Sequence, residues 1–191
     1  MKEKKQFLRL KLVMKINLYL DCDGVILDTI PAIDKALQKV GYTYKGQSKN
    51  EPFMKDFLKN KFNWEEEIEL IPILDDSVNK IKKLDKENIF NIKILTHVIS
   101  DKEAKAKEKL FAELLPNIEV ITVPKEIKKT EMVEVKNGIL VDDYLPNVVD
   151  FNSEGGIGIK FAGKETSDDV IRITDLLELI TFVDKWELLR D

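Results

Sequence analysis

Two aspartates separated by a single residue are the first candidates for chemistry in this sequence. Asp21 and Asp23 lie just after an apolar segment and are followed by Gly24. One carboxylate of such a pair can attack phosphorus to form an aspartyl-phosphate, which divides a slow hydrolysis into two steps. The other can donate a proton to the leaving oxygen and later activate water. Because Gly24 has no side chain, the chain can turn tightly there and approach a phosphate.

Other polar side chains follow further apolar segments. They are Thr96 and His97, then Lys125, Lys128 and Lys129, then Asp142 and Asp143. If these segments are parallel strands, their carboxyl ends share one edge of the sheet, where ligands bind. Several carboxylates without a cysteine or histidine cluster favour a hard cation such as Mg²⁺. The cation would hold a phosphate oxygen, Thr96 would donate a hydrogen bond to the phosphate, and a lysine would complete the charge balance.

Short β-branched segments alternate with helical patterns along the chain. The expected strands are Ile16–Leu20, Ile92–Thr96, Glu119–Val123, Gly138–Val141 and Ile157–Phe161. The expected helices are Ser77–Lys86, Ser100–Leu115, Pro146–Ser153 and Asp168–Trp186, with Ser77 and Ser100 as N-caps and Glu103 completing a capping box after Ser100. Continuously apolar strands between helices predict an α/β fold, in which helices cover both faces of a parallel sheet in three Rossmann-like layers.

Residues 29–71 differ from the rest because they contain helical patterns but no strand-like segment. The patterns cover Ala32–Val40 and Pro52–Leu58. We interpret 29–71 as a small helical cap, 14–28 together with 72–191 as the core domain, and 1–13 as an N-terminal extension. The cap's aromatic residues, among them Phe57 and Trp64, fit its own small core better than a base-binding site.

Composition narrows the choice of partners and location. The 191-residue chain is 43% hydrophobic and 35% charged, with a net charge of −4, as in a globular protein that does not bind nucleic-acid polymers. No apolar run is long enough to span a membrane. The single cysteine, Cys22, fits a reducing cytoplasm, and its place between two aspartates favours a packing role over a nucleophilic one. The leucine-rich segment Val170–Leu189 covers the sheet and leaves a homodimer contact open.

Four motifs in order resemble those of the haloacid-dehalogenase-like (HAD) hydrolases. They are Asp21 to Val25, Ile94 to Thr96, a lysine before Asp142, and Ile139 to Asp143. The resemblance implies that Asp21 is the nucleophile and Asp23 the general acid/base. It implies a phosphate site with Gly24, Thr96, His97 and a lysine, and a Mg²⁺ site with Asp21, the backbone carbonyl of Asp23, Asp142 and Asp143. Since the dehalogenase branch lacks the second aspartate, the resemblance favours a phosphatase or phosphomutase.

The segments Lys129 to Met132, Leu140 to Asn147 and Gly155 to Phe161 are similar to those of the cytosolic 5′(3′)-deoxyribonucleotidase group. In that group a lysine followed by serine or threonine is the phosphate ligand, which selects Lys129 over Lys125 and Lys128. His97 departs from the group, which has serine there. The resemblance implies a small phosphorylated metabolite as substrate, with a 5′-nucleotide as the leading candidate.

Three alternatives stay open. A sugar-phosphate phosphatase or phosphomutase would use the same core, and an inactive phosphate-binding protein would keep the fold without turnover. A signalling receiver domain also places aspartates, a hydroxyl and a lysine at strand ends. In receiver domains, however, the phosphorylated aspartate follows a later strand than the acidic pair, whereas Asp21 and Asp23 share one segment.

Overall fold

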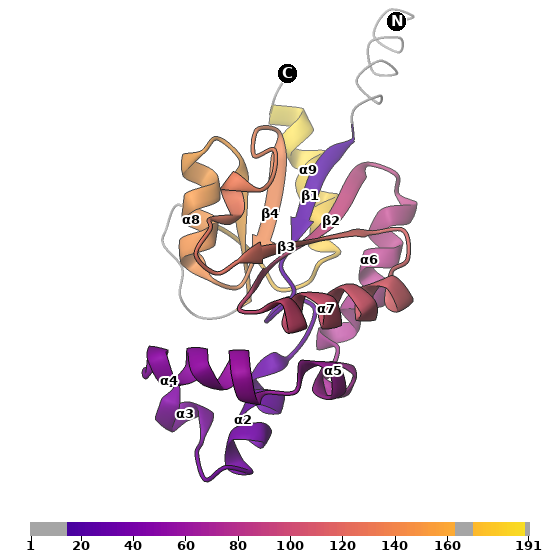
Figure 1. Ribbon diagram of the computed structural model, residues 1–191. Helices are drawn as coiled ribbons and strands as arrows, with labels where there is room; N and C mark the ends of the chain where they lie inside the picture. Colours follow the sequence, from indigo (N-terminus) through magenta and orange to yellow (C-terminus); the bar gives the residue numbers. More distant parts are fainter. Residues whose placement is uncertain (1–14, 163–169, 190–191) are drawn as a thin grey trace, which may run out of the picture.

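A six-stranded parallel sheet forms the centre of the protein (Figure 1). The computed structural model describes residues 15–162 and 170–189, so the expected extension 1–13 lies outside the described residues. The strand order is β3-β2-β1-β4-β5-β6. The strands are β1 (Ile16–Leu20), β2 (Phe90–Val98), β3 (Glu119–Pro124), β4 (Gly138–Asp142), β5 (Ile157–Phe161) and β6 (Ile171–Ile173). The predicted α/β fold with a parallel sheet is confirmed.

The register of the central strands determines what lies at the carboxyl edge of the sheet. β1 lies between β2 and β4, and Leu20 at its end pairs with Ile94 on one side and Val141 on the other. The backbone N–H of Asp21 continues this pairing by donating to the carbonyl of Val141 at 2.9 Å. Asp21 therefore leaves the sheet beside the end of β4, where Asp142 is the last residue of the strand.

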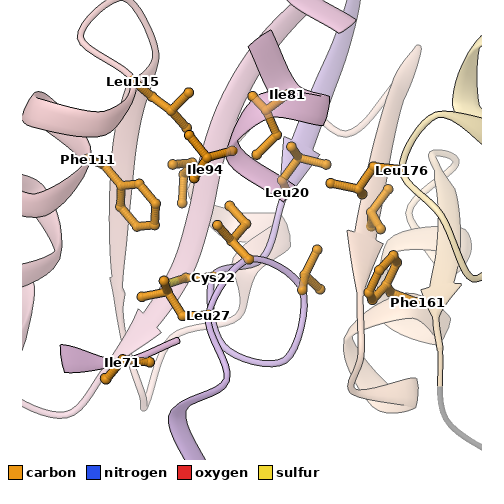
Figure 2. Close-up of a cluster of buried hydrophobic side chains, with 14 of the residues drawn as sticks. Leu20, Cys22, Leu27, Ile71, Ile81, Ile94, Phe111, Leu115, Phe161 and Leu176 are labelled. Carbon is orange, nitrogen blue, oxygen red and sulfur yellow. The ribbon is translucent and has the colours of Figure 1, made fainter. Parts of the chain in front are cut away.

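Helices cover both faces of the sheet. The helices that cover it are α6 (Ser77–Lys86), α7 (Asp101–Leu114), α8 (Leu145–Ser153) and α9 (Glu178–Leu189). Apolar residues of α6, α7 and α9 pack with one face of the strands, in the cluster that Figure 2 shows around Leu20, Ile81 and Phe111. On the other face, Phe151 of α8 packs against Tyr19 and Leu140. No helix in the described part of the chain is long and apolar enough to cross a membrane.

The structure corrects two expectations about helix ends. The segment predicted as one helix from Asp168 is, in its described part, strand β6 followed by α9 from Glu178. The short β-branched segment Ile171–Ile173 pairs with β5, whereas the helical spacing of apolar residues starts only at Leu176. Ser77 is not an N-cap but the first residue of α6, and its hydroxyl donates to the carbonyl of Ile26 at 3.1 Å. Ser100 does cap α7, since its hydroxyl accepts from the N–H of Glu103.

Between β1 and β2 the chain forms a run of short helices, which lie beyond the carboxyl edge of the sheet (purple in Figure 1). They are α2 (Thr29–Gln38), α3 (Tyr44–Gln47), α4 (Glu51–Asp56), the π-helix η1 (Phe57–Lys61), α5 (Trp64–Glu67) and the 3₁₀ helix η2 (Ile68–Leu70). We refer to residues 29–71 as the insert. Phe57, Phe62 and Trp64 are buried with their rings in contact, and they belong to the same apolar cluster as the sheet.

The two connections between the core and the insert lie side by side. Leu27 and Ile73 form an antiparallel bridge, and the N–H of Asp28 donates to the carbonyl of Pro72 at 2.9 Å. The N–H of Leu74 donates to Ile26 in the same way. The chain thus leaves and rejoins the core at one point beside the end of β1.

Candidate active site

Three carboxylates gather at the carboxyl ends of β1 and β4. One oxygen each of Asp21, Asp142 and Asp143 lies within 4.8 Å of the others. Asp21 and Asp142 are buried, whereas Asp143 keeps part of its surface exposed to solvent. Several oxygen ligands converging at this spacing, with no sulfur or imidazole among them, fit Mg²⁺ better than a softer metal. The carboxylate of Asp23 is not part of this group; the expectation that its backbone carbonyl binds the cation stays a prediction.

Lys129 is the cation already present beside this cluster. It lies in the short 3₁₀ helix η4 (Lys129–Glu131), and its Nζ is 2.8 Å from Asp21 Oδ1 and 2.7 Å from Asp142 Oδ2. The lysine is buried, whereas the alternatives Lys125 and Lys128 are exposed and Lys128 pairs with Asp150. Of the three lysines that the sequence left open, Lys129 is therefore the one that lies between the carboxylates.

Hydrogen bonds from the surrounding backbone and side chains orient Asp142. Its Oδ1 accepts from the N–H of Tyr144 at 2.8 Å, and its Oδ2 accepts from Asn147 Nδ2 at 2.9 Å as well as from Lys129. Asn147 lies in the first turn of α8, so the helix that covers this face of the sheet also fixes the carboxylate. These contacts leave Asp142 little freedom to move when a cation or phosphate arrives.

Burial and repulsion between neighbouring charges raise the pKa values of two carboxylates of the cluster. Burial, and then the charge of Asp142, raise the pKa of Asp21 to about 7. Loss of hydration and the same neighbouring charge raise the pKa of Asp143 to about 6. Lys129 opposes both shifts without cancelling them. A divalent cation would therefore compensate a charge excess that one lysine leaves in place.

Gly24 supplies the space that the cluster needs on one side. Its φ of +78° is in the left-handed region that disfavours other residues. A Cβ at this position would lie 2.1 Å from Asp143 Oδ2. Asp143 thus sits directly against the backbone of the turn that carries Asp21 and Asp23, which only glycine permits.

The carboxylate of Asp23 binds a lysine that sequence reasoning missed. Lys107 Nζ, on α7, lies 2.6 Å from Asp23 Oδ2 and 2.8 Å from Glu103 Oε1. It also donates to Thr96 Oγ1 at 3.0 Å. The side chain of Lys107 is fully buried, which is rare for lysine and requires such partners.

A sequence signal for Lys107 did exist. The inward face of α7 carries Glu103, Ala106, Lys107 and Phe111, so an acidic and a basic residue one turn apart lie on the apolar stripe. By its position three residues after Ser100, Glu103 is expected only to complete a capping box. A charged pair on a core-facing stripe is better explained by a buried ionic contact.

The remaining expected residues lie close by. Thr96 is fully buried at the end of β2, and its hydroxyl donates to the carbonyl of His97 at 3.3 Å while accepting from Lys107. His97 Nε2 lies 3.0 Å from the carbonyl of Ile127, in the loop that leads to Lys129. Burial lowers the pKa of His97, which favours the neutral ring. Cys22 points into the apolar core, as Figure 2 shows, which agrees with its expected packing role.

Comparison with solved structures gives the fold class. No protein-family model and no curated protein sequence matches the chain. The HAD-hydrolase YfnB of Bacillus subtilis, solved with bound magnesium, has a TM-score of 0.63 at 15% identity, over 88% of this chain and 98% of that one. A HAD-superfamily hydrolase of subfamily IA from Geobacter sulfurreducens has a TM-score of 0.62 at 14% identity, over 88% and 100%.

A haloacid dehalogenase-like protein of Streptococcus pneumoniae has a TM-score of 0.58 at 11% identity, over 88% of this chain and 98% of that one. A dehalogenase is also similar, with a TM-score of 0.56 at 11% identity. The chain therefore has the fold of the HAD-superfamily hydrolases, with an acidic cluster at the carboxyl edge of its sheet. At these sequence identities the structural similarity shows the fold alone.

Proposed function

We propose that the protein is a Mg²⁺-dependent phosphatase that hydrolyses a small phosphate monoester through an aspartyl-phosphate on Asp21. The observation that carries this proposal is the separation of two neighbouring carboxylates. Asp21 belongs to the cluster with Asp142 and Lys129, whereas Asp23 stands outside it against Lys107. Two carboxylates in different surroundings can perform different steps of one reaction.

In the first step a carboxylate oxygen of Asp21 attacks phosphorus, a new P–O bond forms, and the bond to the leaving oxygen breaks. Asp23, protonated, transfers its proton to that leaving oxygen, so the product leaves as an alcohol. In the second step Asp23 takes a proton from water as the water oxygen attacks the phosphorus. The bond between phosphorus and Asp21 breaks, inorganic phosphate leaves, and both carboxylates return to their starting states.

The side chains of Asp21, Asp142 and Asp143, with the backbone carbonyl of Asp23, would hold Mg²⁺. When bound, the cation would neutralise phosphate charge and so reduce the repulsion between an anionic substrate and an anionic nucleophile. Lys129 would add a positive charge on the same side. Gly24, Thr96 and His97 complete the expected phosphate site, with Thr96 and the backbone beside Gly24 as hydrogen-bond donors.

The leaving group distinguishes the proposed phosphatase from a dehalogenase, and one of the similar structures is a dehalogenase. A halide ion is a stable product and leaves without a proton. An alkoxide needs a proton, and Asp23 is a carboxyl group two residues from the nucleophile that could supply it. An acidic cluster suited to a cation is likewise needed for a phosphate and not for a carbon–halogen bond.

For the substrate we propose a 5′-nucleotide, with the insert as a cap over the strand ends that selects the leaving group. The support is the resemblance of the short segments around Lys129 and Asp142 to those of the deoxyribonucleotidase group. The rings of Phe57, Phe62 and Trp64 pack on one another and are buried, so base stacking on them is not part of the proposal. A sugar phosphate is the alternative, and a panel of nucleotides and sugar phosphates separates the two. A clear preference for sugar phosphates would overturn the nucleotide assignment.

The test of the phosphatase itself uses para-nitrophenyl phosphate, which does not depend on the natural substrate. The wild type should hydrolyse it with Mg²⁺ and lose activity when the metal is chelated. Asp21→Asn should be inactive, whereas Asp150→Asn, at an exposed ion pair on α8, serves as the control and should keep the wild-type rate. Activity in Asp21→Asn equal to the wild type would rule out Asp21 as the nucleophile.

A further inference from the structure

Lys107 connects three parts of the chain at the proposed general acid. Its ammonium contacts Asp23 after β1, the hydroxyl of Thr96 and the carbonyl of His97 at the end of β2, and Glu103 on its own helix. The distances to the two carboxylates are 2.6 and 2.8 Å, and the lysine side chain is not exposed at all. The ammonium group of Lys107 thus has partners on all three of these segments.

The contacts of Lys107 leave the two oxygens of Asp23 unequal. Asp23 Oδ2 accepts the short hydrogen bond from Lys107. Asp23 Oδ1 is buried, and among the described residues no donor or acceptor reaches it. Because 34% of the Asp23 side chain is nevertheless exposed, the oxygen that can reach a bound molecule is Oδ2, the one that Lys107 holds.

The insert also contributes a contact to Lys107. Lys107 Nζ lies 5.7 Å from the centroid of the Trp64 ring, a distance at which a cation is attracted to an aromatic face. Trp64 is held in place because its Nε1 donates to the carbonyl of Leu58 at 2.9 Å. Burial alone would lower the pKa of Lys107, but the charges of Asp23 and Glu103 outweigh it and raise the pKa well above the usual value. The lysine stays charged and keeps its partners.

We propose that Lys107 is a positioning residue that fixes the rotamer of Asp23, so that its exposed oxygen, Oδ2, faces the leaving oxygen of a bound phosphate ester. This inference rests on the proposed phosphatase function and goes beyond it, because it assigns the orientation of the acid to a lysine outside the four motifs. Glu103 forms a second ion pair with the lysine, and the ring of Trp64 lies close to its ammonium group. Loss of Lys107 would free the carboxylate of Asp23 to rotate toward solvent, since 34% of this side chain is exposed.

The test compares two esters that differ only in how much the leaving group needs a proton. Para-nitrophenolate leaves readily without one, whereas the leaving group of phenyl phosphate depends on the acid. The measured quantity is kcat/KM, which covers steps only up to departure of the leaving group, so the later activation of water does not enter. Lys107→Met should lower kcat/KM for phenyl phosphate roughly tenfold or more beyond its effect on para-nitrophenyl phosphate, because general-acid catalysis contributes on the order of 10²–10⁴-fold.

Two further variants complete the design. Lys109→Met removes an exposed lysine from the same helix and should leave the ratio of the two rates unchanged. In an Asp23→Asn background, Lys107→Met should change the ratio no further, because the acid is already absent. If Lys107→Met does not fold, Lys107→Arg carries the test, since it keeps a charge but alters the contact geometry and should shift the ratio in the same direction.

The outcomes separate the two proposals. If the wild type is active and Lys107→Met lowers kcat/KM equally for both esters, the positioning role is overturned and the phosphatase assignment stays intact. A wild type inactive on both esters in the presence of Mg²⁺ would overturn the proposed function, and the role of Lys107 with it.

Discussion

The carboxylates of Asp21 and Asp23 bind two different buried lysines, although only Cys22 separates them in the chain. Lys129 reaches Asp21 from the loop after β3, and Lys107 reaches Asp23 from α7. Side chains two residues apart on a straight strand point to the same side, but the chain bends at Cys22, so Asp21 and Asp23 reach different partners. Cys22, between them, points into the core and keeps the two apart. Each acid thus has its own lysine partner.

Replacing Lys129 should strongly destabilise the metal-free protein. Lys129→Met leaves the buried carboxylates of Asp21 and Asp142 without a cation, and breaking a buried ion pair lowers the free energy of unfolding by about 3–5 kcal/mol. Chemical denaturation at pH 7.5 without Mg²⁺ measures this. Lys128→Met removes an exposed ion pair one residue away and should change the value by less than about 1 kcal/mol. Similar effects of both changes would contradict the buried pairing.

Gly24→Ala should weaken cation binding, and a second glycine provides the control. Both Gly24 and Gly41 have a positive φ, so alanine introduces backbone strain of about 1–2 kcal/mol at either site. Only at Gly24 would the new Cβ collide with Asp143. Calorimetric titration measures the Mg²⁺ affinity. Gly24→Ala should lower this affinity roughly tenfold or more, because changes in the groups that orient a metal ligand typically have an effect of that size. Gly41→Ala should leave the affinity unchanged. Unchanged affinity in Gly24→Ala would exclude Asp143 from the cation site.

Cation binding should strengthen as the pH rises through 6 and 7. The folded pKa values, about 7 for Asp21 and about 6 for Asp143, lie above the unfolded value of aspartate. These groups therefore favour the folded state at low pH, and this contribution is lost as the pH rises through the folded pKa values. Mg²⁺ must displace the protons, so it should raise the Tm more at pH 7.5 than at pH 5.5. An equal rise at both values would mean that the cation binds elsewhere.

The thiol of Cys22 should be inert in the native protein. It is fully buried, and burial, followed by the charge of Asp23, raises its pKa well above the usual value, so little thiolate exists at pH 8. An aromatic disulfide reagent should react at the rate of unfolding and rapidly in denaturant. Asp23→Asn should remain slow, because burial is the larger cause. Rapid labelling of the native wild type would contradict the packing of Cys22.

The strands and the residues at their ends could be predicted because their signals are local. Each strand is a short apolar segment, and the rule that parallel strands end at one edge is enough to gather Asp21, Thr96 and Asp142. Selecting Lys129 from three lysines by sequence needed a family pattern. Its buried position between two carboxylates follows from the fold of the loop after β3, which no periodicity reports.

Lys107 and the last strand were missed for a different reason. The partners of Lys107 lie 84 and 11 residues away in the chain, so its role depends on the packing of α7 against the strand ends. β6 has only three residues, too few for a period to distinguish strand from helix. Both depend on tertiary contacts.

The adjacent connections at Leu27 and Ile73 have a consequence for how such a protein can change over evolutionary time. Because the chain leaves and rejoins the core at one point, a longer or shorter segment could replace the insert without moving β1 or β2, and the entropy of closing it varies only slowly with length. Trp64 is a contact that a replacement would need to reproduce to keep Lys107 covered. Apart from that contact, the insert can therefore diverge without changing the strand ends that carry the acidic cluster.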